Sequence, residues 1–499
     1  MDNSGNIIIT GSSGYENNAD FGTIKYNSSG TLQWMKKFYG AQIVNDGSNG
    51  AVTDKNGNIY TVGRTRTNYG DNISVIKYNS AGTQLWVYDR GDGGAGYNIY
   101  DEGKAITVDT NCNVYITGTV YLYAVSKQDV FTAKLDSNGN ALWFIVTASN
   151  NGDDAGNAID ADNSGNVYIA GQNTGAAGDL NYVTMKYNSA GVVQWTKYAG
   201  LSGLKDVPNA IAVDGSGNVF VTGNADSTGS GQDILTVKYN SAGTQQWIKR
   251  INGSSNSTDA GNSIAVDKGG NAYICGMISQ TVGNDVGIIV KYRNDASGTK
   301  RWEGYVNLTA TTGAETLVSL KLDTSRTKIY AAGSSYGSGV FNTNYTLSKF
   351  DSAGNQQWQK VYDHPGSLYD IAYGLALDKN ENSYITGITN TTTTDFLTVS
   401  YNSAGTFRWF KTFNGNSNGE DFLSGNNQIA VDKNGNVYVA GSSYDTLSGD
   451  QITTVKYKQS SFTLNLTSFI EGLYNSVSNS MISDTVKVCL RSTVSPYNQ

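Results

Sequence analysis

The chain has 499 residues, of which 15% are charged, and it contains 59 glycines, 33 tyrosines and only 3 prolines. Its net charge of −7 and the absence of a Lys/Arg cluster argue against nucleic-acid binding, which needs a basic face. No apolar run approaches the length of about 18 residues that a membrane-spanning helix requires. Turn-forming Gly, Asn and Ser alternate with strand-forming Tyr, Val, Ile and Thr, so we predict an all-β protein.

The chain begins with MDNSGNIIITG, which lacks the basic and apolar regions of a signal peptide and already belongs to a repeat. It stops abruptly at SPYNQ, so we expect a fragment of a longer chain. Cys112, Cys275 and Cys489 show neither a pairing pattern nor metal-ligand spacing. The single histidine, His364, excludes a histidine-rich metal site and leaves little room for a Ser-His-Asp triad.

Tryptophans mark a repeat of about 50–57 residues over residues 1–458. Each repeat contains four strand-like runs, which we letter a to d. In one copy they are NAIAVD (209–214), NVFVTG (218–223), ILTVKY (234–239) and QQWIKR (245–250). Tight turns join a to b, through Asp-x-x-Gly-Asn, and c to d, through Asn-Ser-Ala-Gly. The tryptophans, which lie in run d, are Trp34, Trp86, Trp143, Trp195, Trp247, Trp302, Trp358 and Trp409.

Four short antiparallel strands cannot bury both of their faces, but a closed ring of such sheets can, and this predicts a β-propeller. A linear β-solenoid is the weaker alternative, because its coils usually have shorter periods. Seven sets of runs are complete, while the chain opens with b, c and d and closes with a, b and c. We therefore expect eight blades, with the two partial sets completing or overlapping one another.

Strings such as AVDGSGNVFVTG (212–223) followed by DILTVKYNSAGTQQW (233–247) resemble the bacterial SBBP-type β-propeller repeat of secreted and surface proteins. The resemblance implies an extracellular or cell-surface location, and little about activity. Residues 459–499 break the pattern. Their EGLYN and DTVKVCLR runs resemble the start of a small C-terminal β-domain found behind secreted bacterial repeats, and SFTLNL (461–466) is alternatively a last strand.

The a–b and c–d turns lie on one face of the predicted ring, the turn face, and the b–c and d–a connections lie on the other, the loop face. An acid precedes run a on the loop face in seven repeats: Asp46, Asp101, Asp154, Asp206, Asp259, Glu315 and Asp370. The eighth repeat has Ser424 there, with Glu420 and Asp421 slightly upstream. A second series often precedes run c: Asp20, Asp71, Asp129, Asp179, Asp233, Asp285, Asp395 and Asp450.

Two interpretations of these acids stay open. Hard cations such as Ca²⁺ bind to several carboxylate and carbonyl oxygens, so the first series is a candidate metal site with Ca²⁺ as its cofactor. The alternative is that each acid accepts backbone N–H bonds and fixes its loop, which suits a feature that recurs in every blade.

A ligand site should break the repeat, and the strongest break lies at residues 87–129. It contains Tyr97, Tyr100, Tyr121 and Tyr123, whose rings are suited to stack on sugars or to form a protein-binding patch. The alternative is ordinary loop packing in an irregular blade.

These observations predict a non-enzymatic extracellular module for binding or adhesion, or a structural scaffold, with carbohydrate or protein as its ligand. We expect a monomeric propeller within a longer secreted chain, with no nucleic-acid partner, no membrane span and no catalytic residue. The alternative is a polysaccharide hydrolase or lyase that uses loop-face carboxylates. No acid pair stands out from the repeat pattern to favour it.

Overall fold

The computed structural model describes residues 6–15, 18–26, 32–38, 47–67, 70–91, 99–122, 127–147, 152–162, 164–175, 178–200, 204–229, 231–281, 284–306, 315–336, 343–414, 421–422, 429–431, 436–445, 449–457, 474–475 and 480–481. The chain divides into two compact units, Met1–Gln459 and Ser460–Gln499. In the second unit, the described residues form one short antiparallel pair, β37 (Tyr474–Asn475) with β38 (Ser480–Met481).

Seven consecutive sets of strands form antiparallel meanders, which we number as blades 1 to 7 in chain order. Blade 1 is β4 (Gly47–Thr53), β5 (Ile59–Thr67), β6 (Gly70–Tyr78) and β7 (Gln84–Arg90), with β8 (Ile99–Tyr100) added on β6. Blade 2 is β9 (Glu102–Val108), β10 (Val114–Leu122), β11 (Lys127–Leu135) and β12 (Ala141–Thr147). Blade 3 is β13 (Ala155–Ala161), β14 (Val167–Thr174), β15 (Leu180–Tyr187) and β16 (Val193–Ala199). Blade 4 is β17 (Asp206–Val213), β18 (Val219–Ser227), β19 (Gly231–Tyr239) and β20 (Gln245–Ile251).

The remaining complete blades repeat the same order. Blade 5 is β21 (Ala260–Val266), β22 (Ala272–Thr281), β23 (Asn284–Tyr292) and β24 (Lys300–Val306). Blade 6 is β25 (Glu315–Leu322), β26 (Lys328–Tyr336), β27 (Thr343–Asp351) and β28 (Gln356–Tyr362). Blade 7 is β29 (Tyr369–Leu377), β30 (Ser383–Asn390), β31 (Thr394–Tyr401) and β32 (Phe407–Phe413).

The two ends of the first unit share one further sheet. The N-terminal part is β1 (Ile7–Tyr15), β2 (Asn18–Tyr26) and β3 (Leu32–Phe38). The C-terminal part is β33 (Asp421–Phe422), β34 (Ile429–Val431), β35 (Val437–Asp445) and β36 (Gly449–Tyr457). They join where β1 pairs with β36, at Gly14 opposite Asp450. The ring therefore has eight sheets, as expected, and the eighth has seven strands because the partial sets overlap.

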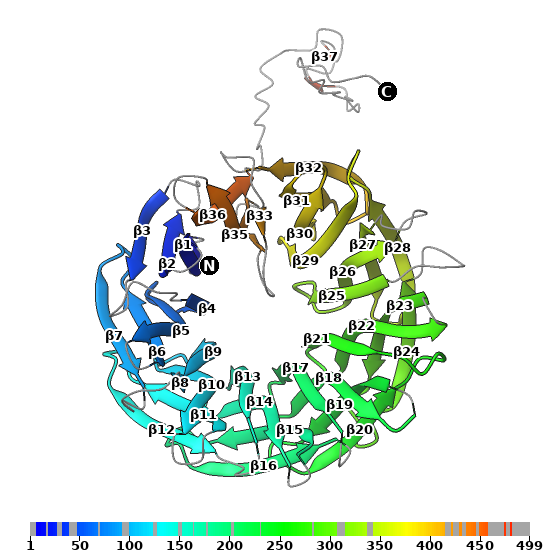
Figure 1. Cartoon of the computed structure of the whole chain (residues 1–499). Coiled ribbons are helices and arrows are strands. Elements are labelled where there is room, and N and C mark those ends of the chain that lie inside the picture. Colours follow the sequence, from blue (N-terminus) through cyan, green and yellow to red (C-terminus); the bar gives the residue numbers. More distant parts are fainter. Residues whose placement is uncertain are drawn as a thin grey trace. The chain divides into compact units, whose positions relative to one another are not determined.

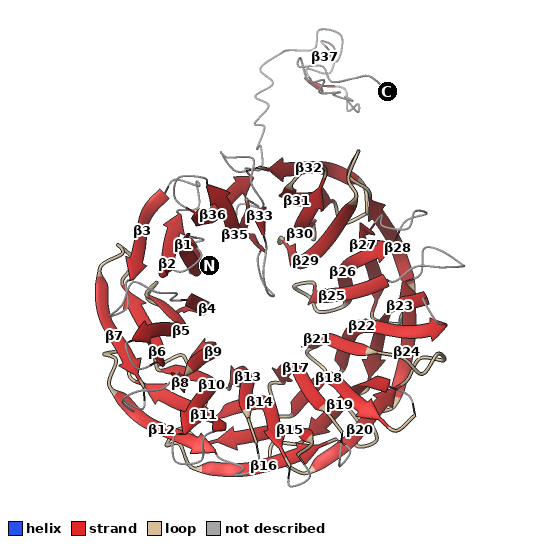
Figure 2. Ribbon diagram, viewed as in Figure 1, coloured by secondary structure: helices blue, strands red, loops and turns tan. Residues whose placement is uncertain are grey.

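The strands of the first unit form a ring in which strand a lies nearest the centre and strand d forms the rim, as β17 and β20 show (Figure 1). Strands and loops make up all the described residues, without helix (Figure 2), so the all-β prediction is confirmed. Strands b and c are the most deeply buried, because each is covered by the blades on both sides. Strand a faces the centre with half-buried side chains.

The Asp-x-x-Gly-Asn turn is held by its own aspartate. In blade 1, Asp54 Oδ1 accepts the backbone N–H groups of Asn56 and Asn58, each at 2.9 Å. Its Oδ2 accepts the Asn58 side-chain amide at 2.8 Å and the Tyr60 hydroxyl at 2.9 Å. The motif is thus a self-contained hydrogen-bonded turn, and one carboxylate also satisfies the buried tyrosine of strand b.

The c–d turn couples each blade to the one before it. In blade 4, the Ser241 carbonyl accepts the Trp195 indole N–H at 3.3 Å and the Lys186 ammonium at 2.9 Å, both from blade 3. The Trp195 ring lies beside Tyr239, with centroids 5.8 Å apart, and covers Gly243. The same Trp and Lys bonds to a serine carbonyl recur at Ser80, Ser137, Ser189, Ser352 and Ser403. We call this contact the tryptophan clamp, and it explains why the Asn-Ser-Ala-Gly turn and the tryptophan recur together.

Candidate functional site

The loop-face acids lie at the start of strand a. Asp206 lies opposite Ala225, and Asp370 lies opposite Thr389. Each of these two partners stands two residues after the glycine that ends the strand-b motif. The described members are all buried: Asp101, Asp154, Asp206, Asp259, Glu315 and Asp370. Asp46 lies outside the described residues.

Three carboxylates of this series accept backbone N–H groups from strand b of their own blade. These bonds run from Tyr121 to Asp101, from Thr174 to Asp154 and from Ser279 to Asp259, at 2.6, 2.6 and 2.7 Å. Each acid therefore caps the point at which strand a joins the sheet. This geometry supports the loop-fixing interpretation.

The backbone of the same acids links neighbouring blades. The Asp259 N–H donates to the Gln232 carbonyl of blade 4 at 2.6 Å, and the Asp154 N–H donates to the Gln128 carbonyl of blade 2 at 2.7 Å. Asp101 makes the corresponding bond to the Asp71 carbonyl at 3.2 Å. The acid thus lies at the seam between two blades, with its carboxylate on one blade and its N–H on the other.

The eighth member of the series is Asp421. It is buried and lies opposite Ser443, again two residues after the strand-b glycine. The sequence spacing assigned this place to Ser424, and that assignment is wrong. The residues between β33 and β34 lengthen the interval, whereas pairing with β35 keeps the acid in place.

Calcium binding by these acids stays a prediction. Among the described residues, no group of three His, Cys, Asp or Glu side chains is arranged to hold a metal ion. Burial raises the pKa of Asp259 to about 6, against the lowering effect of the N–H bonds from Ser279 and Gly253. The pKa of Asp370 is also raised by burial.

The second acid series includes members that are paired with arginines. Asp233 lies 3.1 Å from the Arg250 guanidinium, and Asp71 lies 2.9 Å from that of Arg66. Asp71, Asp129, Asp179, Asp233 and Asp395 are buried, Asp285 is half-buried, and nothing is described of the side chains of Asp20 and Asp450.

Two of the four predicted tyrosines lie in the described part of the chain. Tyr100, on β8, is 45% exposed, and Tyr121, on β10, is half-buried. The structure brings them close along the backbone, because Asp101, which follows Tyr100, accepts the Tyr121 N–H. Tyr97 and Tyr123 lie outside the described residues.

Tyr100 belongs to a row of side chains across three strands. Arg66 on β5 pairs in register with Asp71 on β6, which in turn pairs with Tyr100 on β8. Register partners point to the same side of a sheet, and the Arg66 guanidinium lies 5.6 Å from the centre of the Tyr100 ring. Arg64, two residues before Arg66, adds a 3.6 Å ion pair with Asp71. Sequence reasoning missed both arginines, although they also break the repeat.

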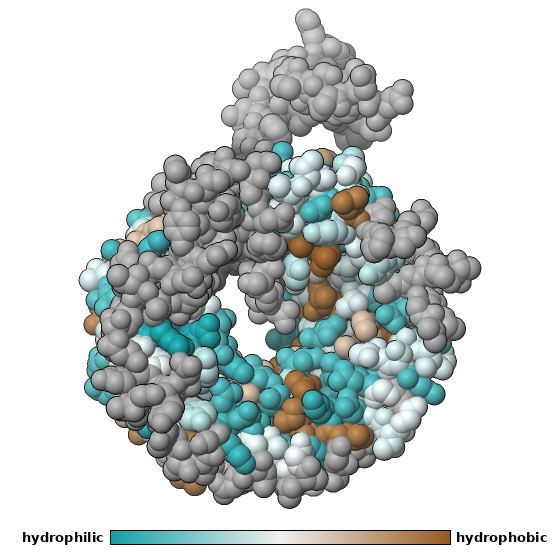
Figure 3. Space-filling model, in the orientation of Figure 1, coloured by the Kyte–Doolittle hydropathy of each residue, from teal (hydrophilic) through white to brown (hydrophobic). Residues whose placement is uncertain are grey.

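We call Arg64, Arg66, Asp71 and Tyr100 the arginine–tyrosine row. It lies on the loop face, where β5 ends and β6 begins. Figure 3 shows strongly hydrophilic side chains gathered over β4 and β5, beside an opening at the centre of the ring. The row combines an exposed ring with two guanidiniums, a combination suited to binding rather than to proton transfer.

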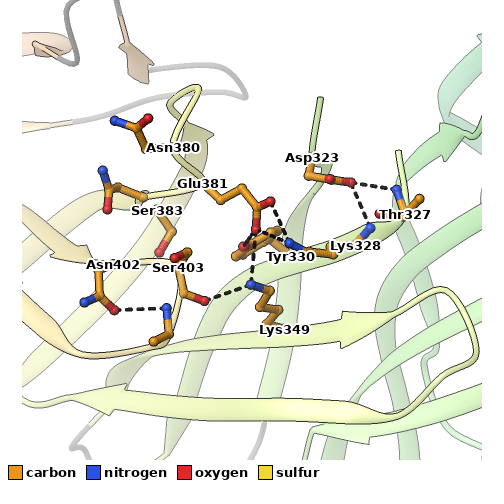
Figure 4. Close-up of polar contacts among 12 residues, drawn as sticks. Asp323, Thr327, Lys328, Tyr330, Lys349, Asn380, Glu381, Ser383, Asn402 and Ser403 are labelled. Carbon is orange, nitrogen blue, oxygen red and sulfur yellow. Dashed lines mark hydrogen bonds and ion pairs between the residues drawn. The ribbon is translucent and has the colours of Figure 1, made fainter. Parts of the chain in front are cut away.

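A second polar cluster lies on the turn face between blades 6 and 7 (Figure 4). Glu381 occupies the glycine place of its turn, with a positive φ of 61°. Its carboxylate accepts hydrogen bonds from the Lys328 ammonium at 2.7 and 2.8 Å and from the Tyr330 hydroxyl at 3.0 Å. Lys349 lies 3.3 Å away. Glu381 thus replaces the turn aspartate as partner of the strand-b tyrosine and links the two blades.

The lone histidine lies in an aromatic cluster rather than beside a nucleophile. His364 lies edge-on to Phe410, with ring centroids 5.3 Å apart, and 6.4 Å from Tyr362. Cys112 and Cys275 are buried free thiols, and Cys489 lies outside the described residues. None of the described residues belongs to a helix that could cross a membrane.

A family model described as "SBBP: Beta-propeller repeat" matches residues 194–229, 246–280 and 427–447. At these three places the chain is similar to the SBBP β-propeller repeat. The first two SBBP matches begin within a strand d and run through the following strands a and b. They contain Asp206 and Asp259, two of the acids at the start of strand a, which we call the seam acids. The arginine–tyrosine row lies outside all three matches.

No curated protein matches the chain. Among solved structures, a eukaryotic initiation factor is 10% identical with a TM-score of 0.45, covering 80% of this chain and 87% of that chain. The polysaccharide lyase Uly1 is 9% identical with a TM-score of 0.43, covering 84% and 92%. The β-propeller domain of the Trilobed protease from Pyrococcus furiosus is 8% identical with a TM-score of 0.37, covering 72% and 98%. At these scores the likenesses carry no argument about function.

Proposed function

We propose that this chain is a non-enzymatic extracellular binding module whose loop face holds a carbohydrate against Tyr100. The observation that carries the proposal is the exposure of Tyr100 at a place where the SBBP repeat pattern breaks. An aromatic ring held on a strand offers contact area at little cost in side-chain entropy.

The seam acids support this proposal indirectly. Their carboxylates accept N–H groups in several blades, so they hold the loop face rigid. A rigid scaffold that carries variable loops is a common arrangement in binding proteins. Secretion, a monomeric state and freedom from nucleic-acid partners form part of the same proposal, and the low charge content and net charge of −7 support the last of these.

A glycan array followed by calorimetry tests the proposal. Wild-type protein should bind at least one saccharide, and Tyr100→Ala should weaken that binding at least about fivefold, or ~1 kcal/mol. Tyr198→Ala is the matched control, because Tyr198 is an exposed tyrosine on the rim strand β16. Binding that Tyr198→Ala weakens as much as Tyr100→Ala does, or a protein ligand in place of a saccharide, would contradict the proposal.

Asp259 is a candidate acid for the enzymatic alternative. Asp259 has the raised pKa that a general acid needs. However, the carboxylate is buried, and its two oxygens accept the Ser279 and Gly253 N–H groups at 2.7 and 2.6 Å. Release of reducing ends from polysaccharide, abolished by Asp259→Asn without loss of folding, would favour the enzyme.

A further inference from the structure

The arginine–tyrosine row departs from the other blades in charge. Arg64 and Arg66 stand one and three residues after the strand-b glycine, positions that point to the same side of the sheet. The equivalent pairs in blades 2 to 7 are Thr119 and Tyr121, Gln172 and Thr174, Asn224 and Asp226, Met277 and Ser279, Ser334 and Tyr336, and Ile388 and Asn390. Blade 1 alone among these seven carries a cationic pair there.

Asp71 does not use up the hydrogen-bonding capacity of Arg64. Its Oδ1 lies 2.9 Å from Arg66 and its Oδ2 lies 3.6 Å from Arg64, so one carboxylate faces two guanidiniums. Each guanidinium has five N–H donors in a fixed planar arrangement. The Arg64 contact is an ion pair beyond hydrogen-bond distance. The trio therefore carries a net charge of +1, and Arg64 keeps donors for a further acceptor.

The same side chains are open to solvent. The exposed fraction of the side chain is 40% for Arg64 and 27% for Arg66, whereas it is 3% for Asp71. Tyr100 stays 45% exposed although Arg66 lies over its ring. An anion approaching from the loop face thus meets two guanidiniums and an aromatic ring before it meets the buried carboxylate.

We propose that the arginine–tyrosine row binds an anionic saccharide. Arg64 holds its carboxylate or sulfate group beside the positive charge of Arg66, and Tyr100 stacks on the sugar ring that carries this group. Guanidinium groups match planar or trigonal oxyanions with paired hydrogen bonds, which ammonium groups cannot do. This inference rests on the proposed function and names the class of saccharide.

Nearby carboxylates lower the affinity that we expect for an anion. Asp101, which follows Tyr100, is buried and accepts the Tyr121 N–H, and Glu102 accepts the Asn49 amide at 2.9 Å. These charges and the net charge of −7 oppose long-range attraction of an anion. Affinity therefore comes from short-range hydrogen bonds to the guanidiniums, so added salt should weaken it only moderately compared with binding to a broad basic patch.

The test compares three polymers: polygalacturonate, which carries carboxylates, dextran sulfate, which carries sulfates, and neutral dextran. The first two distinguish the sources of the anionic group, and we expect at least one of them to bind while dextran does not. Arg64→Ala should weaken that binding about tenfold or more, as expected for the loss of charge-assisted hydrogen bonds. Arg64→Lys should restore only part of the loss, because an ammonium cannot form the paired bonds.

Arg293→Ala is the matched control, since it removes the same charge from an exposed arginine in a c–d turn on the turn face. An equal loss in Arg293→Ala, or full recovery in Arg64→Lys, would overturn the assignment to Arg64. Binding of neutral dextran that depends on Tyr100 but not on Arg64 would refute the anionic class and leave the proposed function standing. Failure of every saccharide on the array would refute both.

Discussion

The tryptophan clamp yields a quantitative prediction about what couples the blades. Gly243, in the c–d turn of blade 4, has a positive φ of 78°, and a Cβ there would lie 2.4 Å from Trp195 Cγ of blade 3. Gly243→Ala therefore meets two penalties. The left-handed backbone costs roughly 1–2 kcal/mol for alanine, and displacing a packed side chain costs about 1–3 kcal/mol.

Gly229 separates the two penalties. It lies in the same blade with a similar φ of 87°, but a Cβ there would find nothing within 4 Å. Gly229→Ala should therefore cost only the backbone term, about 1–2 kcal/mol, whereas Gly243→Ala should cost about 2–5 kcal/mol. The difference between the two variants measures the contact with Trp195.

Equilibrium urea unfolding, followed by far-UV circular dichroism, gives the comparison. A second background sharpens it, because Trp195→Ala removes the ring that the new methyl group meets. In that background, Gly243→Ala should cost no more than Gly229→Ala. The reasoning is refuted if the two alanine variants unfold at the same urea concentration in the wild-type background, or if Gly243→Ala is equally costly with and without Trp195.

Three further predictions concern charged groups. Glu381→Gln should cost about 1–3 kcal/mol at pH 7. Hydrogen bonds from Lys328, Tyr330 and Lys349 outweigh burial and hold the Glu381 pKa below its usual range. This stabilisation is therefore lost as pH falls through the lowered pKa, and the difference in stability between wild type and Glu381→Gln should shrink at acid pH. The raised pKa of Asp259 has the opposite effect on the pH dependence of stability. The stability of wild type relative to Asp259→Asn should fall as pH rises from about 4 to 6. A difference in stability that does not change with pH would contradict this prediction. If the seam acids bind Ca²⁺, millimolar Ca²⁺ should raise the thermal midpoint above that in EDTA, by the equivalent of about 2.7 kcal/mol at 100 times Kd; an unchanged midpoint would leave them as N–H acceptors.

The fold could be predicted because its rules are local and repeated. The aspartate of the a–b turn binds the backbone only two and four residues on, as Asp54 does with Asn56 and Asn58. The same pair of bonds recurs at Asp109, Asp162, Asp214, Asp267 and Asp378. The sheet that joins the two ends was predicted only as completion or overlap, because the bridge between Gly14 and Asp450 depends on how the ring closes.

The candidate site could be predicted only in part, because it depends on pairing between distant residues. Tyr100 was predicted from the aromatic break in the repeat. The role of Asp71 was not predicted. In the sequence it is one acid of a series, whereas in the fold it lies between Arg66 and Tyr100. That row depends on the short parallel pairing of β8 with β6, which no period in the sequence indicates. Asp421 was similarly hidden by irregular spacing.

The two faces of the ring differ in how freely their residues can change. On the turn face, the Ser241 carbonyl and Gly243 receive side chains from the preceding blade, so a substitution there disturbs two blades at once. On the loop face, the acid at the start of strand a accepts bonds mainly from backbone atoms, as Asp101, Asp154 and Asp259 show, although Asp154 also accepts the Asn173 side-chain amide. Residues beside that acid can therefore vary without loss of the ring. Tyr100 immediately precedes one such acid, Asp101, and for this reason a binding site can arise at a single seam of an otherwise uniform propeller.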